Sequence, residues 1–266
     1  MKRILIVVDG SANDADSLSC ARNMAALTGA QLTVAHALVS NQTLVGFGEF
    51  IFAAPESDRS NRNETQARAA FDSVCGDLPG ARFLTYNASC DTITAALGHA
   101  HDLIMVERLS GEDGPEASNL NAALFNTGRL VFLVPPRATN GPIGRAAIAW
   151  NGSAQTARAI KSALPLLQMA QAVVLLTGSG AGQVAVEPLL EYLAAYDLSP
   201  SVQGYDSERL TARARGRALI AAASQAGADL LVMGAFGESQ AGALAGLGRA
   251  TRKVVTAALI PVLLQS

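Results

Sequence analysis

Six residues in the last part of the chain have the types found in loops that bind phosphate: Met233, Gly234, Gly237, Gly248, Arg249 and Thr251. Glycines let backbone N–H groups approach a phosphate closely, and a helix that follows them directs its positive end toward the ligand. Arg249 adds a full positive charge, and Thr251 adds a hydroxyl group that donates or accepts a hydrogen bond. The segment therefore predicts a site for a phosphate-bearing ligand.

A second polar segment, Asn151-Gly152-Ser153, follows an apolar run and completes the candidate site. The side chain of Asn151 both donates and accepts hydrogen bonds. Ligands of parallel α/β sheets bind beyond the carboxyl ends of the strands, where the strand order reverses. We therefore expect Asn151 and Gly152 to lie beside the glycines of the first segment as ligand-binding residues.

The spacing of the remaining polar residues does not support catalysis or a resident metal. No set of residues in the sequence has the arrangement of a nucleophile with its base and acid, or the spacing of metal ligands. Cys20, Cys75 and Cys90 are odd in number and form no CxxC motif, which argues against a disulfide framework and a zinc site. We therefore expect a protein that is not an enzyme and that carries no metal beyond Mg²⁺ bound to a nucleotide.

The composition favours a folded intracellular protein. Half of the 266 residues are hydrophobic and 16% are charged, which excludes extensive disorder. The formal net charge of −2 argues against a nucleic-acid-binding protein and against a polybasic membrane-binding protein. No apolar run approaches the ~18 residues of a membrane span, and the five apolar residues that follow Arg3 are too few for a secretory signal. A cytoplasmic location is expected.

The chain contains a duplicated unit. Asn151-Gly152-Ser153 repeats Asp9-Gly10-Ser11 after 142 residues, and the run that begins at Asp229 repeats the run that begins at Asp102 after 127 residues. The first unit is therefore longer between these landmarks by about fifteen residues. A proline-rich linker separates the two units, because Pro135, Pro136 and Pro142 lie between them.

Two α/β domains are predicted from this repeat, at residues 1–137 and 143–266. Each has five short segments that indicate strands, with helical patterns between them, and the continuous apolar run 4–8 is typical of a strand buried on both faces. The strands are expected at 4–8, 32–38, 81–86, 103–106 and 130–134, and at 145–150, 172–177, 201–205, 230–233 and 261–264. Helices are expected near 62–76, 91–100 and 117–126.

The order and spacing of these segments resemble the universal stress protein family in its tandem form, with two copies in one chain. The stretches that carry the resemblance are 4–11, 148–167 and 228–237 running on to Thr251. The resemblance implies two Rossmann-like domains of the adenine-nucleotide-alpha-hydrolase type. Each would have a five-stranded parallel sheet of order 3-2-1-4-5, with helices on both faces. It also implies pairing of the two copies through their last strands, a non-enzymatic role in stress tolerance, and binding of ATP or another adenine nucleotide.

The candidate loop departs from the pattern of the family's nucleotide-binding members. They have Gly-x-x-Gly after strand 4 and, after nine intervening residues, Gly with a small hydroxyl residue. Gly234 and Gly237 match the first pair, but Leu247 stands at the later position and Arg249 follows Gly248. Three interpretations stay open: phosphate binding in an altered register, a pocket filled by the arginine, and glycines that serve only a turn and close helix packing.

The acid that ends strand 1 in those members is Asn151 here, and Gly178 stands where an apolar residue packs on the base. The first domain keeps Asp9, but its strand-4 segment reads Glu107-Arg108-Leu109-Ser110. A carboxylate at position 107 opposes phosphate binding unless Arg108 neutralises it. We therefore expect the first domain to act as the permanent partner of the second.

Three further features concern partners and alternative functions. Arg209, Arg213 and Arg217 are spaced to share one helix face, which we interpret as a solvated face. The apolar segment 44–54, in the 44–60 insertion of the first domain, predicts a lid or a homodimer contact.

The alternative to a nucleotide-binding stress protein is a nucleotide-free interaction scaffold of the same fold. A weak ATPase would be a third class, although the chain lacks the Ser-Gly-Gly-x-Asp-Ser loop of ATP pyrophosphatases.

Overall fold

The computed structural model describes residues 1–38, 56–109, 111–135, 141–179, 184–235, 244 and 246–266. The segment 44–54 and Gly237 lie outside the described residues, so the proposed lid or homodimer contact stays a prediction. In the described part of the chain, no helix is both long enough and apolar enough to cross a membrane.

Strands and helices alternate along the chain. The first half contains β1 (Arg3–Val8), α1 (Asp14–Thr28), β2 (Gln31–Ala37), α2 (Glu56–Cys75), β3 (Arg82–Tyr86), α3 (Cys90–Gly98), β4 (Leu103–Glu107), α4 (Pro115–Asn126) and β5 (Leu130–Val134). The second half contains β6 (Arg145–Trp150), α5 (Ala154–Leu167), β7 (Ala172–Gly178), α6 (Glu187–Ala194), β8 (Ser201–Tyr205), α7 (Ala212–Gln225), β9 (Leu230–Gly234), α8 (Arg249–Ala257) and β10 (Val262–Gln265).

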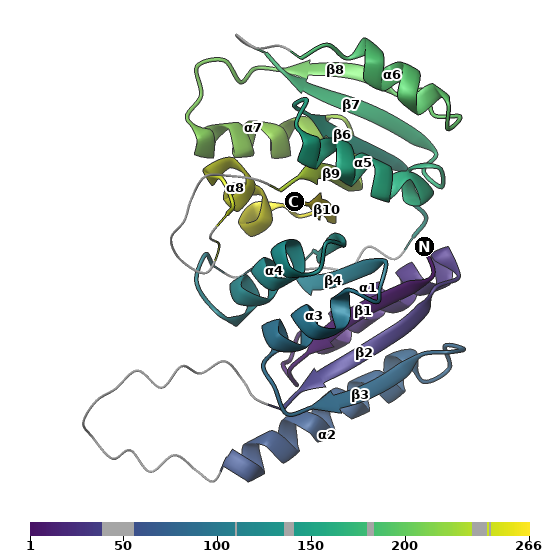
Figure 1. Cartoon of the computed structure of the whole chain (residues 1–266), viewed down its shortest axis with the longest axis vertical. Coiled ribbons are helices and arrows are strands. Elements are labelled where there is room, and N and C mark those ends of the chain that lie inside the picture. Colours follow the sequence, from purple (N-terminus) through teal and green to yellow (C-terminus); the bar gives the residue numbers. More distant parts are fainter. Residues whose placement is uncertain (39–55, 110, 136–140, 180–183, 236–243, 245) are drawn as a thin grey trace, which may run out of the picture.

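The strands form one ten-stranded sheet in the order β3-β2-β1-β4-β5-β10-β9-β6-β7-β8. Each half therefore has the expected strand order 3-2-1-4-5, and within each half the strands pair in parallel. The halves meet through their last strands, because β5 and β10 pair antiparallel with Phe132 opposite Leu263. The β3 and β8 edges consequently lie at opposite ends of the molecule (Figure 1).

Both faces of the sheet are buried beneath helices. Alternate residues of one strand enter different cores: Ile4 and Ile6 pack on one face, and Leu5 and Val7 pack on the other. The first core includes residues of α1, α2, α5 and α6, and the second includes residues of α3, α4, α7 and α8. Each core extends through both halves. This arrangement explains why short, continuous apolar runs were a reliable sign of strands in this sequence.

The order in which the strands are added to the sheet reverses at two points, between the parallel neighbours β1 and β4 and between the parallel neighbours β6 and β9. At these points the helices that follow neighbouring strands leave on opposite faces, which opens a crevice at the carboxyl ends. The two crevices are the places where this fold positions a ligand.

Candidate functional site

A cleft of about 800 Å³ lies at the crevice of the second half, between the carboxyl ends of the strands and the helices α7 and α8. Six of the eight residues predicted from the sequence line it: Asn151, Met233, Gly234, Gly248, Arg249 and Thr251. Gly152 lies next to it, because an added Cβ at this residue would meet Val184, which lines the cleft. The structure thus brings together segments that are about 80 residues apart in the sequence.

The carboxamide oxygen of Asn151 accepts hydrogen bonds from nearby residues of the second half. Oδ1 accepts hydrogen bonds from the Ser153 backbone N–H (3.1 Å), the Ser153 hydroxyl (2.8 Å) and the Thr156 hydroxyl (2.7 Å). A backbone N–H can only donate, so the atom that faces Ser153 must be the oxygen. The Nδ2 amino group, which is a pure donor, is therefore the polar end that Asn151 offers to a ligand.

The turn after β6 has a backbone shape that favours glycine. Gly152 has φ +70°, and an ideal Cβ there would lie 2.6 Å from Cγ1 of Val184. Ser153 then caps α5, since its hydroxyl accepts the Thr156 N–H at 3.2 Å. One N–H of the first turn of α5 thus has its partner within the protein.

Two glycines of the site are also packing residues. An ideal Cβ on Gly234 would lie 2.6 Å from the backbone nitrogen of Thr156, so this glycine lets β9 and the first turn of α5 approach closely. An ideal Cβ on Gly216 of α7 would lie 2.6 Å from the carbonyl oxygen of Ala250 on α8. These contacts support the interpretation that the glycines serve packing, whether or not a ligand is bound.

The N-terminus of α8 faces the cleft and has no side-chain cap. Its N-cap residue is Gly248, and the next three residues, Arg249 to Thr251, all line the cleft. The first turn of a helix carries a partial positive charge and N–H groups without partners inside the helix. Arg249 is exposed, and the cleft volume of about 800 Å³ already takes account of the space that its side chain occupies. The arginine therefore lines the pocket but does not fill it.

Two arginines of the cleft were not recognised from the sequence. The expected helix face of Arg209, Arg213 and Arg217 was wrong, because α7 begins at Ala212 and Arg209 precedes it. Arg209 and Arg215 line the cleft instead. The Arg215 Nε donates to the Leu210 carbonyl (3.2 Å). Arg209 comes four residues after Tyr205, the last residue of β8, and residues just beyond the carboxyl end of a strand lie near the ligand site of this type of sheet. This position in the sequence is the signal that could have identified Arg209.

The side chains around these arginines keep the cleft positive. Glu208 is the one acid among the described lining residues, against Arg209, Arg215 and Arg249. Burial raises the pKa of Tyr205, which also lines the cleft, and the nearby Arg215 partly offsets this effect. The phenol is therefore neutral at physiological pH and adds no negative charge.

The crevice of the first half is smaller and acidic. Its volume is about 90 Å³, and four acids are among its described lining residues: Asp9, Asp14, Glu107 and Glu116. Burial, with the nearby charges of Asp9 and Glu107, raises the pKa of Asp14 to about 7. Burial also raises the pKa of Glu107, which accepts a 2.7 Å hydrogen bond from the Ser17 hydroxyl.

The repeat places opposite chemistry at equivalent positions of the two crevices. The offset of 142 residues matches Asp9 with Asn151 and Asp14 with Thr156, and the offset of 127 matches Glu107 with Gly234. Three acids in the first half thus correspond to neutral residues in the second. Such a reversal favours anions in the second crevice and disfavours them in the first.

Arg108 is used across the junction between the halves. Its Nη1 donates to the carbonyl oxygen of Thr256, in the last turn of α8, at 3.0 Å. The positive side chain is favourable at this negative end of the helix. Arg108 therefore binds α8 of the second half in this structure and does not neutralise Glu107 for phosphate binding in the first crevice.

Cys20, Cys75 and Cys90 are free thiols, and burial raises the pKa of each, with that of Cys75 at about 11. Among the residues that the structure describes, no three His, Cys, Asp or Glu side chains are placed to hold a metal ion. The expectation that any Mg²⁺ arrives with a nucleotide stays a prediction.

No family model and no curated protein matches the sequence. Solved structures do match. A universal stress protein from Archaeoglobus fulgidus DSM 4304 is 14% identical, covers 99% of this chain and 96% of its own, and has a TM-score of 0.75. A candidate universal stress protein from Pseudomonas aeruginosa UCBPP-PA14 (15% identity, 100% and 93% coverage) has a TM-score of 0.58. A protein of unknown function from Pseudomonas aeruginosa PAO1 (14% identity, 100% and 92% coverage) has a TM-score of 0.57.

The chain therefore has the universal stress protein fold over its whole length. The resemblance seen in the sequence is confirmed at the level of fold, including the sheet order and the pairing through the last strands.

Proposed function

We propose that this chain is a tandem universal stress protein that binds an adenine nucleotide, ATP or a related one, in the cleft of its second half. The observation that carries the proposal is the convergence of the predicted residues on one cleft that also presents Arg209, Arg215 and Arg249. The role would be binding in a stress response, without catalysis.

Charge supports an anionic ligand. Three guanidinium groups and the N-terminus of α8 border the cleft, against the single acid Glu208 among the described lining residues. Guanidinium groups bind phosphate oxygens through paired N–H donors, and backbone N–H groups at a helix start do the same. Phosphates of the ligand would contact Arg249 and the first turn of α8.

Size and lining support a nucleotide rather than a free phosphate. A cleft of about 800 Å³ is within the usual range for small-molecule sites. Apolar side chains of Leu219 and Met233 also line it, and they offer a surface for a base. Gly178 lines the same cleft, and an ideal Cβ on it would lie 2.5 Å from the Ser207 hydroxyl oxygen, so Ser207 takes the space next to this glycine.

Asn151 supports an acceptor on the ligand. Because Oδ1 is held by Ser153 and Thr156, the side chain offers N–H donors. A ribose or phosphate oxygen, or a ring nitrogen of adenine, is a suitable partner. Where the family pattern has the carboxylate of an aspartate, this chain thus offers the Nδ2 amino group of Asn151, so the position would still bind a ligand, but through a donor.

A nucleotide-free scaffold of the same fold is the second candidate. The close approach of Gly234 to Thr156 favours it, because packing alone accounts for this glycine. In that case the cleft would be a surface between helices, and the protein would act through its partners. A homodimer is one such partnership, and the 44–54 segment is its candidate contact.

We also propose that the two halves are domains with bounds at 1–137 and 143–266 and that the protein is cytoplasmic. The position of the linker supports the bounds, since β5 ends at Val134 and β6 begins at Arg145. The pairing of β5 with β10 would make the first domain the constant partner of the second.

The two candidate functions are separated by one experiment on the purified full-length protein. It is denatured, the supernatant is assayed for adenine nucleotides, and fresh protein is titrated calorimetrically with ATP and with adenosine. The proposal expects sub-millimolar ATP binding and weaker adenosine binding, because adenosine has no phosphates for the arginines. No released nucleotide and no binding heat with ATP would leave the scaffold.

A further inference from the structure

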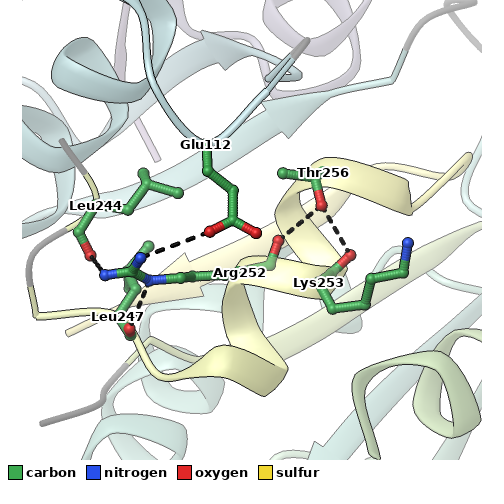
Figure 2. Close-up of polar contacts among 6 residues, drawn as sticks. All are labelled: Glu112, Leu244, Leu247, Arg252, Lys253 and Thr256. Carbon is green, nitrogen blue, oxygen red and sulfur yellow. Dashed lines mark hydrogen bonds and ion pairs between the residues drawn. The ribbon is translucent and has the colours of Figure 1, made fainter. Parts of the chain in front are cut away.

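Arg252, on α8, holds the turn that leads into the cleft (Figure 2). Its Nε donates to the carbonyl oxygen of Leu247 and its Nη2 to that of Leu244, both at 3.0 Å. The Leu247 N–H also donates to the Leu244 carbonyl at 3.1 Å. The guanidinium group therefore fixes the chain immediately before Gly248, where the cleft-lining turn of α8 begins.

The first half of the chain holds Arg252 from the other side. The Glu112 Oε2 lies 3.5 Å from the Arg252 Nη1, and Figure 2 shows the carboxylate directed at the guanidinium group. Glu112 belongs to the segment between β4 and α4, which is the first half's counterpart of the segment between β9 and α8. The arginine side chain is 16% exposed and the glutamate 45%. The ion pair thus joins the β4–α4 segment of the first half to α8 of the second half.

Two further contacts connect the same regions. The Arg108 side chain donates to the Thr256 carbonyl in the last turn of α8. Gly246 has φ +84°, and an ideal Cβ on it would lie 2.8 Å from the ring of Phe125 on α4, so the turn approaches this ring closely. The first half therefore contacts α8 at its C-terminal end and the turn that precedes its N-terminal end.

We propose that the β4–α4 segment of the first half is a positioning element for the ligand site of the second half, acting through Arg252. Glu112 orients the guanidinium group, the guanidinium group fixes the turn at Leu244 and Leu247, and the turn sets the start of α8. The ligand-affinity part of this inference rests on the proposed function. The hold on the turn does not.

The energetics favour positioning over overall stability. An ion pair with a partly exposed acid contributes little to folding, because water and salt screen it. A guanidinium group that donates hydrogen bonds to two carbonyl oxygens can still restrict the conformations of the turn that contains them. A site that is held in its binding conformation before the ligand arrives has a higher ligand affinity. We therefore expect variants of Glu112 to change the turn and the ligand site more than the unfolding transition.

The first test needs no ligand. Amide hydrogen exchange is measured at Leu247 in the full-length wild type, in Glu112→Gln and in Asp113→Asn. Asp113→Asn is the matched control, because it removes the same charge from the adjacent exposed residue. The proposal expects faster exchange at Leu247 in Glu112→Gln and wild-type exchange in Asp113→Asn. Equal protection of Leu247 in all three proteins would overturn it.

The second test measures ATP affinity and thermal unfolding of the same proteins, with Arg252→Lys added. Glu112→Gln should bind ATP roughly two- to fivefold more weakly, with an unfolding temperature close to that of the wild type. Arg252→Lys should lose more affinity, since lysine cannot reach both carbonyls with a planar fork. Wild-type affinity in Glu112→Gln would contradict the coupling. A wild type that binds no ATP would refute the proposed function, and the exchange at Leu247 would still decide whether the first half holds the turn.

Discussion

The Thr156 hydroxyl donates a 2.7 Å hydrogen bond to the carboxamide oxygen of Asn151, and this bond orients the amide. With the two bonds from Ser153, it turns the oxygen toward α5 and leaves the amino group as the donor. At the equivalent place in the first half stand Asp9 and Asp14, two acids. The polarity of the second crevice thus depends on a few side chains at repeat-related positions.

Asn151→Asp should have opposite effects on stability and affinity. The new carboxylate would still accept the bonds from Ser153 and Thr156, and a negative charge is favourable at the N-terminus of α5, by about 0.5 kcal/mol. It would also replace the donor with a charged acceptor, which we expect to weaken ATP binding roughly tenfold. Urea unfolding and calorimetric titration measure the two quantities. ATP binding as tight as in the wild type would contradict the assigned orientation of the amide.

Gly234→Ala should destabilise the protein with no ligand present. The added methyl group would be forced against the Thr156 backbone nitrogen, and we expect a loss of about 2 kcal/mol in the free energy of unfolding. Gly204→Ala is the matched control, because the nearest atom to an added Cβ on this strand residue is 4.0 Å away. Equal urea midpoints for the two variants would show that β9 and α5 are not packed as described.

The contribution of Asp14 to stability should fall as the pH rises from about 4 to 7. Its pKa is about 7 in the folded protein against 3.8 for the ordinary group, so the folded state binds the proton more tightly. Deprotonation then lowers the free energy of unfolding, by up to about 4 kcal/mol. Glu107, whose pKa is also raised, adds to the slope in the same direction.

Asp14→Asn tests this explanation, because the amide oxygen can still accept the Gly10 N–H bond while the charge is removed. We expect higher stability at pH 8 and a flatter dependence of the urea midpoint on pH. Asp16→Asn, on the exposed side of the same helix, should keep the wild-type slope. An unchanged slope in Asp14→Asn would assign the pH dependence to other groups.

Arg209→Gln should weaken ATP binding by roughly three- to tenfold, since one cation that lines the cleft would be lost. Arg217→Gln is the comparison, because Arg217 is exposed on α7 and is not among the cleft residues. Titrations at two salt concentrations should show a smaller salt dependence for Arg209→Gln. The same affinity in both variants would mean that phosphates do not contact Arg209.

Most of the fold could be predicted from the sequence because most of the inner strands are buried on both faces, whereas the edge strands β3 and β8 are only partly buried. Runs such as Ile4–Val8 have no polar residue, and the repeat located the same five strands twice. The strand order and the β5–β10 pairing came from the family resemblance, since periodicity alone does not state which strands are neighbours. The positions of Asn151 and Gly234 beside one cleft followed from the strand order.

The remaining features depend on boundaries and long-range contacts. Arg209 was placed on a helix face because the spacing of arginines suggested a helix, yet Thr211 caps α7 and the helix begins at Ala212. The partner of Arg108 is Thr256, which lies 148 residues away in the other half. A local pattern contains no information on such a pair, and only the packed halves bring its members together.

The proposed function requires that the second-half cleft bind the phosphates of an adenine nucleotide. Its most direct test is calorimetric titration of ATP into the wild type, Arg249→Gln and Arg213→Gln, since Arg213 is on α7 but does not line the cleft. We predict that Arg249→Gln binds ATP about tenfold more weakly and that Arg213→Gln binds it like the wild type. The same affinity in all three proteins, or no binding by the wild type, would contradict the claim.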